Sequence, residues 1–165
     1  MPFGFPNPVN EKAARVVAGV VAILGLVILA TGARWLLVVL AYGFWARVLT
    51  GPTLSPLGRV AMRGVAPRLG EPRYVPGPPK RFAQGIGAAL TTAAAVLALG
   101  FGADAAADVL TAMLVVAATL ESVFALCLGC QIFAGLMRLG LVPEETCERC
   151  ADIWARPPRP EASRP

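Results

Sequence analysis

A chain of 165 residues that is 56% hydrophobic and 15% charged, with a mean hydropathy of +0.65, is too apolar for an ordinary soluble domain. It contains no histidine, which excludes Ser-His-Asp catalysis, Cys-His catalysis and imidazole metal ligation. The net charge of +5 comes from Lys and Arg residues that flank hydrophobic segments, which favours a lipid bilayer over nucleic acid as the partner. We therefore expect a membrane protein that binds no nucleic acid.

Four apolar stretches are candidates for membrane spans: residues 13–30, 35–49, 83–101 and 105–128. A span needs about 20 apolar residues, so the second stretch must draw on its flanks. Only a few residues join the first pair and the last pair, and such short connections predict two antiparallel helical hairpins. The predicted fold class is all-α, a multi-pass membrane bundle of four transmembrane helices within residues 1–140.

The first apolar stretch also fits a signal peptide. Lys12 and Arg15 precede its apolar core, and residues 30–32 resemble a small-residue cleavage site. A second apolar stretch follows almost at once, which favours a retained span. Cleavage would leave the orientation of the other helices unchanged.

The longest polar segment, residues 50–80, divides into two parts. Ser55-Pro56 is a helix-start pattern, and Pro67 is expected to stop the helix. Apolar residues lie near one face of this helix and Arg59 and Arg63 lie on another, which predicts a short helix in the membrane interface. Residues 71–79 then read as an extended, proline-rich strap. The apolar face consists of Leu57, Val60, Ala61 and Val65.

The distribution of positive charge predicts the topology. With four spans, every Lys and Arg of the chain except Arg34 falls on one side of the membrane. Positive residues are enriched on the cytosolic side, so both termini and the central loop should be cytosolic in a cell (inner) membrane.

Four cysteines then fall on the cytosolic side. Cys127 and Cys130 close the fourth apolar stretch, and Cys147 and Cys150 lie in a cytosolic segment, residues 141–155, before a disordered tail of residues 156–165. In a reducing compartment, paired cysteines indicate metal, redox or sulfur chemistry more often than structural disulfides.

Four motifs carry a family resemblance. VNEKAAR, GPTLSPLGR, PGPPKRFAQGIG and LESVFALCLGC stand at residues 9–15, 51–59, 76–87 and 120–130. With them the chain resembles the uncharacterised bacterial membrane family known as domain-of-unknown-function family 4395. The resemblance implies a small helical membrane protein with cytosolic cysteines, but no settled activity, and it does not extend to Cys147 and Cys150.

The two C-x2-C pairs, separated by 16 residues, allow two chemistries. Four thiolates from two turns suit a zinc ion, which would make the protein a zinc-stapled membrane adaptor. Alternatively, no cofactor is bound and the pairs exchange disulfides or relay sulfur with a soluble thioredoxin-like or sulfurtransferase protein. All four cysteines are catalytic candidates in this second reading. Inert, buried cysteines remain the third possibility.

The position of the first pair bears on its reactivity. Placed at the C-terminal end of an apolar helix, Cys127 and Cys130 are expected to have raised pKa values.

Glu121 lies inside the fourth apolar stretch, where a carboxylate is costly and needs a partner. Arg47 of the second stretch is the predicted partner, and Arg15 of the first stretch could also reach toward it. On a continuous helix Glu121 would face away from Cys127 and Cys130, so we do not expect it to be their general base. A structural ion pair is one interpretation of Glu121, and a proton or ion pathway in a small transporter is the other.

Overall fold

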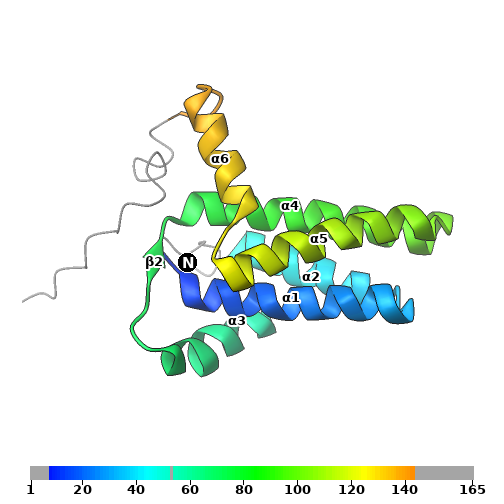
Figure 1. The fold of residues 1–165 in the computed structure, drawn as a ribbon, viewed down its shortest axis with the longest axis horizontal. Helices are drawn as coiled ribbons and strands as arrows, with labels where there is room; N and C mark the ends of the chain where they lie inside the picture. Colours follow the sequence, from blue (N-terminus) through cyan, green and yellow to red (C-terminus); the bar gives the residue numbers. More distant parts are fainter. Residues whose placement is uncertain (1–7, 53, 144–165) are drawn as a thin grey trace, which may run out of the picture.

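The computed structural model describes residues 8–52 and 54–143, and their fold is all-α apart from one pair of two-residue strands. Three long helices and one shorter helix run along one another as a bundle (Figure 1). These are α1 (Glu11–Thr31), α2 (Leu36–Thr50), α4 (Gly77–Ala95) with its continuation η3 (Val96–Gly100), and α5 (Asp104–Phe124).

Three of these helices are long and apolar enough to cross a membrane: α1, α4 with η3, and α5. The fourth, α2, has 15 residues, or about 22 Å of helix, and falls short of that length. Many large apolar side chains nevertheless point outward from the bundle, as in a protein surrounded by lipid. Among them are Ile23 of α1, Val39 of α2, Val96 of η3 and Val116 of α5.

The helices do not pack most closely with their neighbours in the chain. The largest contacts join α1 to α5 and α2 to α4, whereas α1 and α2 touch only slightly. Glycines permit these approaches: a Cβ on Gly25 would collide with Val115 of α5, and one on Gly87 would collide with the ring of Phe44. The hairpin connections are therefore present, but the close packing lies between the two hairpins.

One end of the bundle is closed by an ion-pair cluster. Arg34, in the connection between α1 and α2, pairs with Asp108 through both carboxylate oxygens and lies 3.4 Å from Asp104. Both aspartates belong to the first turns of α5. This cluster fixes the two short connections against each other at the end of the bundle opposite α6 (Figure 1).

The predicted helix of the central segment is present and begins where expected. The Ser55 side chain accepts a hydrogen bond from the backbone N–H of Gly58 at 3.1 Å, an N-cap that starts α3 (Pro56–Val60). The chain continues through a π-helical turn, η1 (Ala61–Val65), and a 3₁₀ turn, η2 (Ala66–Leu69). Pro67 lies within η2 rather than ending the helix.

The apolar residues of this segment divide between the bundle and the outer surface. Ala61 and Ala66 are buried, and η1 packs against α1, whereas Val60 of the predicted apolar face is 60% exposed. The strap that follows is partly a strand: β2 (Tyr74–Val75) pairs antiparallel with β1 (Val9–Asn10). The strap thus returns the chain to the start of α1 before α4 begins.

The fourth apolar stretch is not one helix. Helix α5 ends at Phe124. After three non-helical residues a new helix, α6 (Leu128–Arg138), begins and projects away from the bundle (Figure 1). The prediction of a span reaching residue 128 was therefore wrong in its end, and this difference decides where the thiols lie.

Candidate functional site

The end of α5 is shaped by a contact from α1. The guanidinium of Arg15 donates to the backbone carbonyls of Ser122 at 3.0 Å and Val123 at 3.1 Å, so a cation occupies the C-terminus of α5. Ala125 then takes a left-handed conformation with φ of 56°, and the N–H of Leu126 bonds back to the carbonyl of Leu120. Together these contacts terminate the helix inside a run of apolar residues.

Cys127 is the N-cap of α6. Its backbone is extended, and its sulfur accepts a hydrogen bond from the backbone N–H of Cys130 at 3.4 Å. The pair therefore lies at a helix N-terminus, where backbone N–H groups and the helix dipole stabilise a thiolate. This corrects the sequence-based placement of both thiols at the C-terminal end of the fourth apolar helix; of the raised pKa values expected there, the one for Cys130 is confirmed and the one for Cys127 is wrong.

The start of α6 is seated directly on α4. A Cβ on Gly129 would lie 2.5 Å from Cβ and 2.6 Å from Cα of Ala83, so only glycine permits this approach. Farther along, the rings of Phe133 and Phe82 lie 5.5 Å apart in a tilted arrangement. These contacts hold Cys127 and Cys130 beside the first turns of α4, where both are buried.

Lys80, in the first turn of α4, is the cation of the site. Its Nζ lies 2.5 Å from Oε1 of Glu121, and both side chains are largely buried. The Lys80 charge also acts on the sulfurs of Cys127 and Cys130. The positive charge of Lys80 therefore acts on one carboxylate and two thiols at the junction of α4, α5 and α6.

The contact partner of Glu121 is Lys80 rather than the predicted Arg47, although Arg47 and Glu121 line one cavity and their charges interact. Arg47 donates from Nε to the side-chain amide of Gln84 at 2.8 Å, and its guanidinium stacks over Phe44, 4.6 Å from the ring centroid. The expectation that Glu121 faces away from both cysteines assumed one continuous helix. It fails because α5 ends at Phe124, before the chain reaches Cys127. Glu121 consequently shares a cluster with both cysteines, through Lys80.

The two thiols differ in their acidity. The hydrogen bond from the Cys130 thiol, opposed by burial and aided by the charge of Lys80, lowers the pKa of Cys127. The same hydrogen bond, together with burial and the negative charge on Cys127, raises the pKa of Cys130. Cys127 is therefore the sulfur that ionises first.

Cys127 lies between two cavities. One, of about 230 Å³, is bounded by the charged side chains of Glu11, Arg73 and Lys80 and by both cysteines. Glu11 and Arg73 form an ion pair of 2.9 Å on its rim. The other, of about 220 Å³, extends into the bundle and is mostly apolar. The sulfur thus has a charged space on one side and an apolar space on the other.

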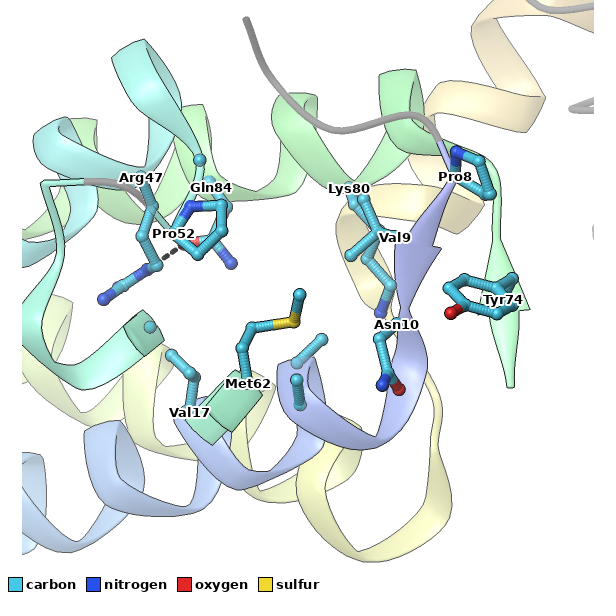
Figure 2. Close-up of a pocket in the computed structure, with 14 residues that line it drawn as sticks. Pro8, Val9, Asn10, Val17, Arg47, Pro52, Met62, Tyr74, Lys80 and Gln84 are labelled. Atoms are coloured by element: carbon cyan, nitrogen blue, oxygen red, sulfur yellow. Dashed lines mark hydrogen bonds between the residues drawn. The ribbon is translucent and has the colours of Figure 1, made fainter. Parts of the chain in front are cut away.

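A third, smaller cavity of about 100 Å³ lies between the start of α1, the connection from α2 to α3, and the strands (Figure 2). The Met62 side chain occupies its middle, and Arg47 and Gln84 lie together at one end. Lys80 contributes to its lining too. Arg47 and Gln84 also line the apolar cavity beside Cys127, and Lys80 also lines the charged one. The third cavity therefore shares side chains with both cavities of the thiol site.

The second cysteine pair, Cys147 and Cys150, lies outside the described residues, as does most of the predicted segment 141–155 and all of the tail 156–165. Within residues 8–52 and 54–143, no three Cys, Asp or Glu side chains are grouped so that they could hold a metal ion. The predicted four-thiolate zinc site thus remains a prediction.

Comparison with protein families agrees with the resemblance seen in the motifs. A family model described as domain of unknown function (DUF4395) matches residues 9–138, which is most of the chain. The chain belongs to the DUF4395 family. The DUF4395 match contains the whole cluster of Lys80, Glu121, Cys127 and Cys130, whereas Cys147 and Cys150 lie beyond it. No curated protein and no solved structure matches the chain.

Sequence reasoning missed two residues of this site. Lys80 was counted only as one positive charge beside a span, and Arg15 as another that could reach toward Glu121, not as a cap of the helix that ends beyond it. A positive residue directly before an apolar stretch is common in membrane proteins, so neither carried a distinguishing pattern. Their roles arise from α4 and α1 meeting the end of α5.

Proposed function

We propose that this DUF4395 protein carries out thiol–disulfide exchange at a membrane face, with Cys127 as the attacking thiolate and Cys130 as the resolving thiol. The observation that carries the proposal is the position of Cys127 at the N-cap of α6, with its sulfur accepting the Cys130 N–H and facing the Lys80 charge. The N–H hydrogen bond at the helix N-terminus and the charge of Lys80 both favour the thiolate, which is the reactive form in disulfide exchange.

The reaction balances without a further cofactor. The Cys127 thiolate attacks one sulfur of a partner disulfide, forms a mixed disulfide and releases the other partner sulfur as a thiolate. Cys127 then carries no negative charge and accepts no thiol hydrogen bond, so two causes of the raised pKa of Cys130 disappear. Cys130 gives its proton to the partner sulfur released first, attacks Cys127 and releases the second partner sulfur, which takes a proton from water. Two electrons pass to the partner, which leaves as a dithiol, and the pair becomes a disulfide.

Lys80 and Glu121 have supporting roles in this scheme. Lys80 stabilises the thiolate electrostatically, and the Glu121 carboxylate holds Lys80 in the cluster through their contact. The negative charge of Glu121 opposes ionisation of both thiols. The opposing charges of Lys80 and Glu121 therefore set how readily the two thiols ionise.

We further propose that α2 also crosses the membrane, giving four spans in a cell (inner) membrane with both termini cytosolic. Arg47 of α2 bonds to Gln84 and Arg81 bonds to the carbonyl of Val48, so the end of α2 lies level with the start of α4. The other end of α2 lies at the Arg34 cluster. A 15-residue helix then needs only its flanks, or a locally thinned bilayer, to span.

The helical segment from Pro56 to Leu69 would lie in the cytosolic interface. Arg59, Arg63 and Arg68 are exposed along it, in reach of anionic headgroups. A soluble thioredoxin-like or sulfurtransferase protein would exchange first with Cys147 and Cys150, which then pass the exchange to Cys127 and Cys130 at the membrane surface.

Trapping a mixed disulfide tests this function. With Cys130→Ser, the attack on Cys127 that releases the partner is removed, so a disulfide-bonded partner should accumulate on Cys127 and be visible on a non-reducing gel. The Cys127→Ser, Cys130→Ser double variant is the matched control. Adducts of equal amount in both proteins, or none with Cys130→Ser under oxidising conditions, would overturn the assignment of Cys127 as the nucleophile.

A structural zinc site is the second candidate. Amide-to-sulfur hydrogen bonds of the Cys130-to-Cys127 kind also suit a turn that presents thiolates to a metal, and the second C-x2-C would complete a four-thiolate set. Elemental analysis of the purified protein decides. One zinc per chain, lost in Cys127→Ser and in Cys147→Ser alike, would replace exchange by the adaptor function.

A further inference from the structure

The apolar cavity behind Cys127 is enclosed by α1, α2, α4, α5 and the start of α6. Its lining is largely aliphatic and aromatic, and Cys127 stands at its end toward α6. Thiol exchange with a soluble protein needs the charged cavity on the other side of the sulfur, and gives this apolar space no role. The apolar side chains include Val17, Val21, Phe44, Leu90 and Leu114.

Arg47 is a hydrogen-bond donor that faces this space. It is only 7% exposed and forms no contact ion pair with a carboxylate in the described part of the chain, although Glu121 lines the same cavity and its negative charge acts on the guanidinium. Among those residues, the only acceptor of its side chain is Gln84, which takes the Nε–H, while the guanidinium stacks on Phe44. A buried guanidinium with spare N–H groups beside a cavity is suited to a ligand oxygen.

The cavity also reaches the outer, apolar surface of the protein. Met113 of α5 and Ile132 of α6 line it, and they are 55% and 50% exposed. Met113 is one of the outward-facing apolar side chains of the bundle, and Ile132 is exposed on α6, next to the end of α5. A ligand would therefore enter sideways from the lipid rather than from water.

We propose that this cavity binds the ring of a lipophilic quinone, which takes two electrons from the Cys127–Cys130 dithiol. The proposal rests on the thiol chemistry of the proposed function and names its second partner. A quinone is a lipid-soluble, two-electron acceptor with a flat apolar ring and carbonyl oxygens. The ring suits the apolar lining beside Phe44, and a carbonyl oxygen suits the donors of Arg47.

The step balances in atoms and electrons. The two sulfurs lose two electrons and form one S–S bond, and the quinone gains two electrons. Two protons are taken up by the quinone oxygens to give the quinol. The Cys130 thiol supplies one, and water in the charged cavity replaces the one that Cys127 has already lost. The exchange of the proposed function then runs in reverse: a soluble dithiol reduces the Cys127–Cys130 disulfide and becomes a disulfide itself, so electrons pass from a cytosolic thiol to the quinone.

The experiment uses the full-length chain in lipid nanodiscs, with Cys147→Ser and Cys150→Ser so that only one pair is counted. The reduced protein is mixed with ubiquinone-1 without oxygen. Quinol formation is followed by absorbance, and disulfide formation by the mass of alkylated protein. We expect one quinol per disulfide and no quinol with Cys127→Ser. Disulfide without an equal amount of quinol would overturn the electron transfer.

Two alanine substitutions on α5 test the place of binding. Ala117 lines the cavity, whereas Ala112 is exposed on the same helix and does not. Ala117→Leu fills the space and should slow quinol formation at least tenfold, while Ala112→Leu should leave the rate unchanged. Reaction of Cys127 with oxidised lipoamide checks that the thiol site of each variant is folded. Equal rates in the two folded variants would overturn binding in this cavity.

Arg47→Met tests the donor. Loss of a hydrogen bond to a charged group corresponds to roughly tenfold or more in affinity, so half-saturation should need at least tenfold more ubiquinone-1. An unchanged half-saturation in a protein that still reacts with oxidised lipoamide would overturn this role. The parent protein separates the two proposals. If it exchanges disulfides with lipoamide but forms no quinol, only the quinone proposal is rejected. If it does neither, the proposed function is rejected as well.

Discussion

At the scale of single residues, the two sulfurs of the site should titrate separately. The contacts that lower the pKa of Cys127 and raise that of Cys130 predict that only Cys127 is alkylated readily near neutral pH. Site-resolved mass spectrometry of iodoacetamide labelling against pH measures this. The midpoint for Cys127 should lie below about 8.5, the value of a free thiol, and that for Cys130 above it. Coincident midpoints would show that the helix N-terminus does not separate the two thiols.

Lys80→Gln should move the midpoint of Cys127 to higher pH, because the positive charge that favours its thiolate is removed. Arg81→Gln is the matched control, since Arg81 is the next residue and donates instead to the carbonyl of Val48. The same labelling profile is measured for both. An equal movement in the two variants would mean that Lys80 acts only through net charge.

Glu121→Gln should have the opposite sign. Removal of the carboxylate takes away a negative charge that opposes ionisation, so the Cys127 midpoint should move to lower pH. The glutamine keeps a hydrogen-bond acceptor for Lys80, and the fold should be preserved. If Glu121→Gln instead leaves the labelling profile unchanged and abolishes ion or solute flux into vesicles, Glu121 belongs to a transport pathway.

The residues of this cluster were only partly predictable. Cys127, Cys130 and Glu121 are conspicuous in the sequence because thiols and a carboxylate are unusual in an apolar run. Lys80 is separated from Glu121 by 41 positions, and no local pattern indicates that its side chain turns toward the thiols rather than toward headgroups. The pairing depends on how α4 packs on α5 and α6.

At the scale of helices, the boundary between α5 and α6 shows where pattern reading fails. The residues around Ala125 are apolar and include neither glycine nor proline before Gly129, so the sequence indicates a continuous helix. The break instead requires Arg15 of α1, which bonds to the carbonyls at the end of α5. A cap supplied by a distant part of the chain leaves no mark in the local sequence. The start of α3 was predictable, because Ser55 caps it locally.

Gly129→Ala tests how α6 positions the thiols. The added methyl would collide with Ala83 and push α6 from α4, at a cost of about 1–3 kcal/mol in the free energy of unfolding. Gly135→Ala in the same helix is the control, because an added Cβ there meets nothing within 4 Å. A loss of thermal stability and a change in Cys127 labelling are expected with Gly129→Ala only, because Gly135→Ala leaves the packing intact and favours the helix. Comparable stability and labelling in the two variants would contradict the close contact of α6 with α4.

At the scale of the whole molecule, composition was enough to predict an all-α protein with membrane-like helices. It could not predict that α1 packs on α5 and α2 on α4, since small residues occur on several faces of these helices and only the assembled bundle selects among them. The charge pattern did anticipate one feature of the arrangement. Arg34 and its two aspartates gather at one end of the bundle, and the Lys80 cluster lies at the other.

This separation predicts the topology of labelling in cells. In a chain with all four cysteines replaced by serine, Gly102→Cys should react with a membrane-impermeant maleimide in intact cells. Gly70→Cys, at the thiol end, should react only after permeabilisation. Both glycines lie in exposed connections, so the pair is matched for access, and both have positive φ, so each cysteine carries backbone strain. Labelling of Gly70→Cys in intact cells would place the thiols in an oxidising compartment.

The central claim, that Cys127 and Cys130 are a reversible redox couple, is tested most directly by a redox titration. The Cys147→Ser, Cys150→Ser protein is equilibrated in thiol buffers from about −300 to −120 mV, and the disulfide fraction is read from alkylated mass. A single two-electron transition inside that range, absent in Cys130→Ser, is the expected result. Two thiols that stay reduced across the whole range would contradict the account.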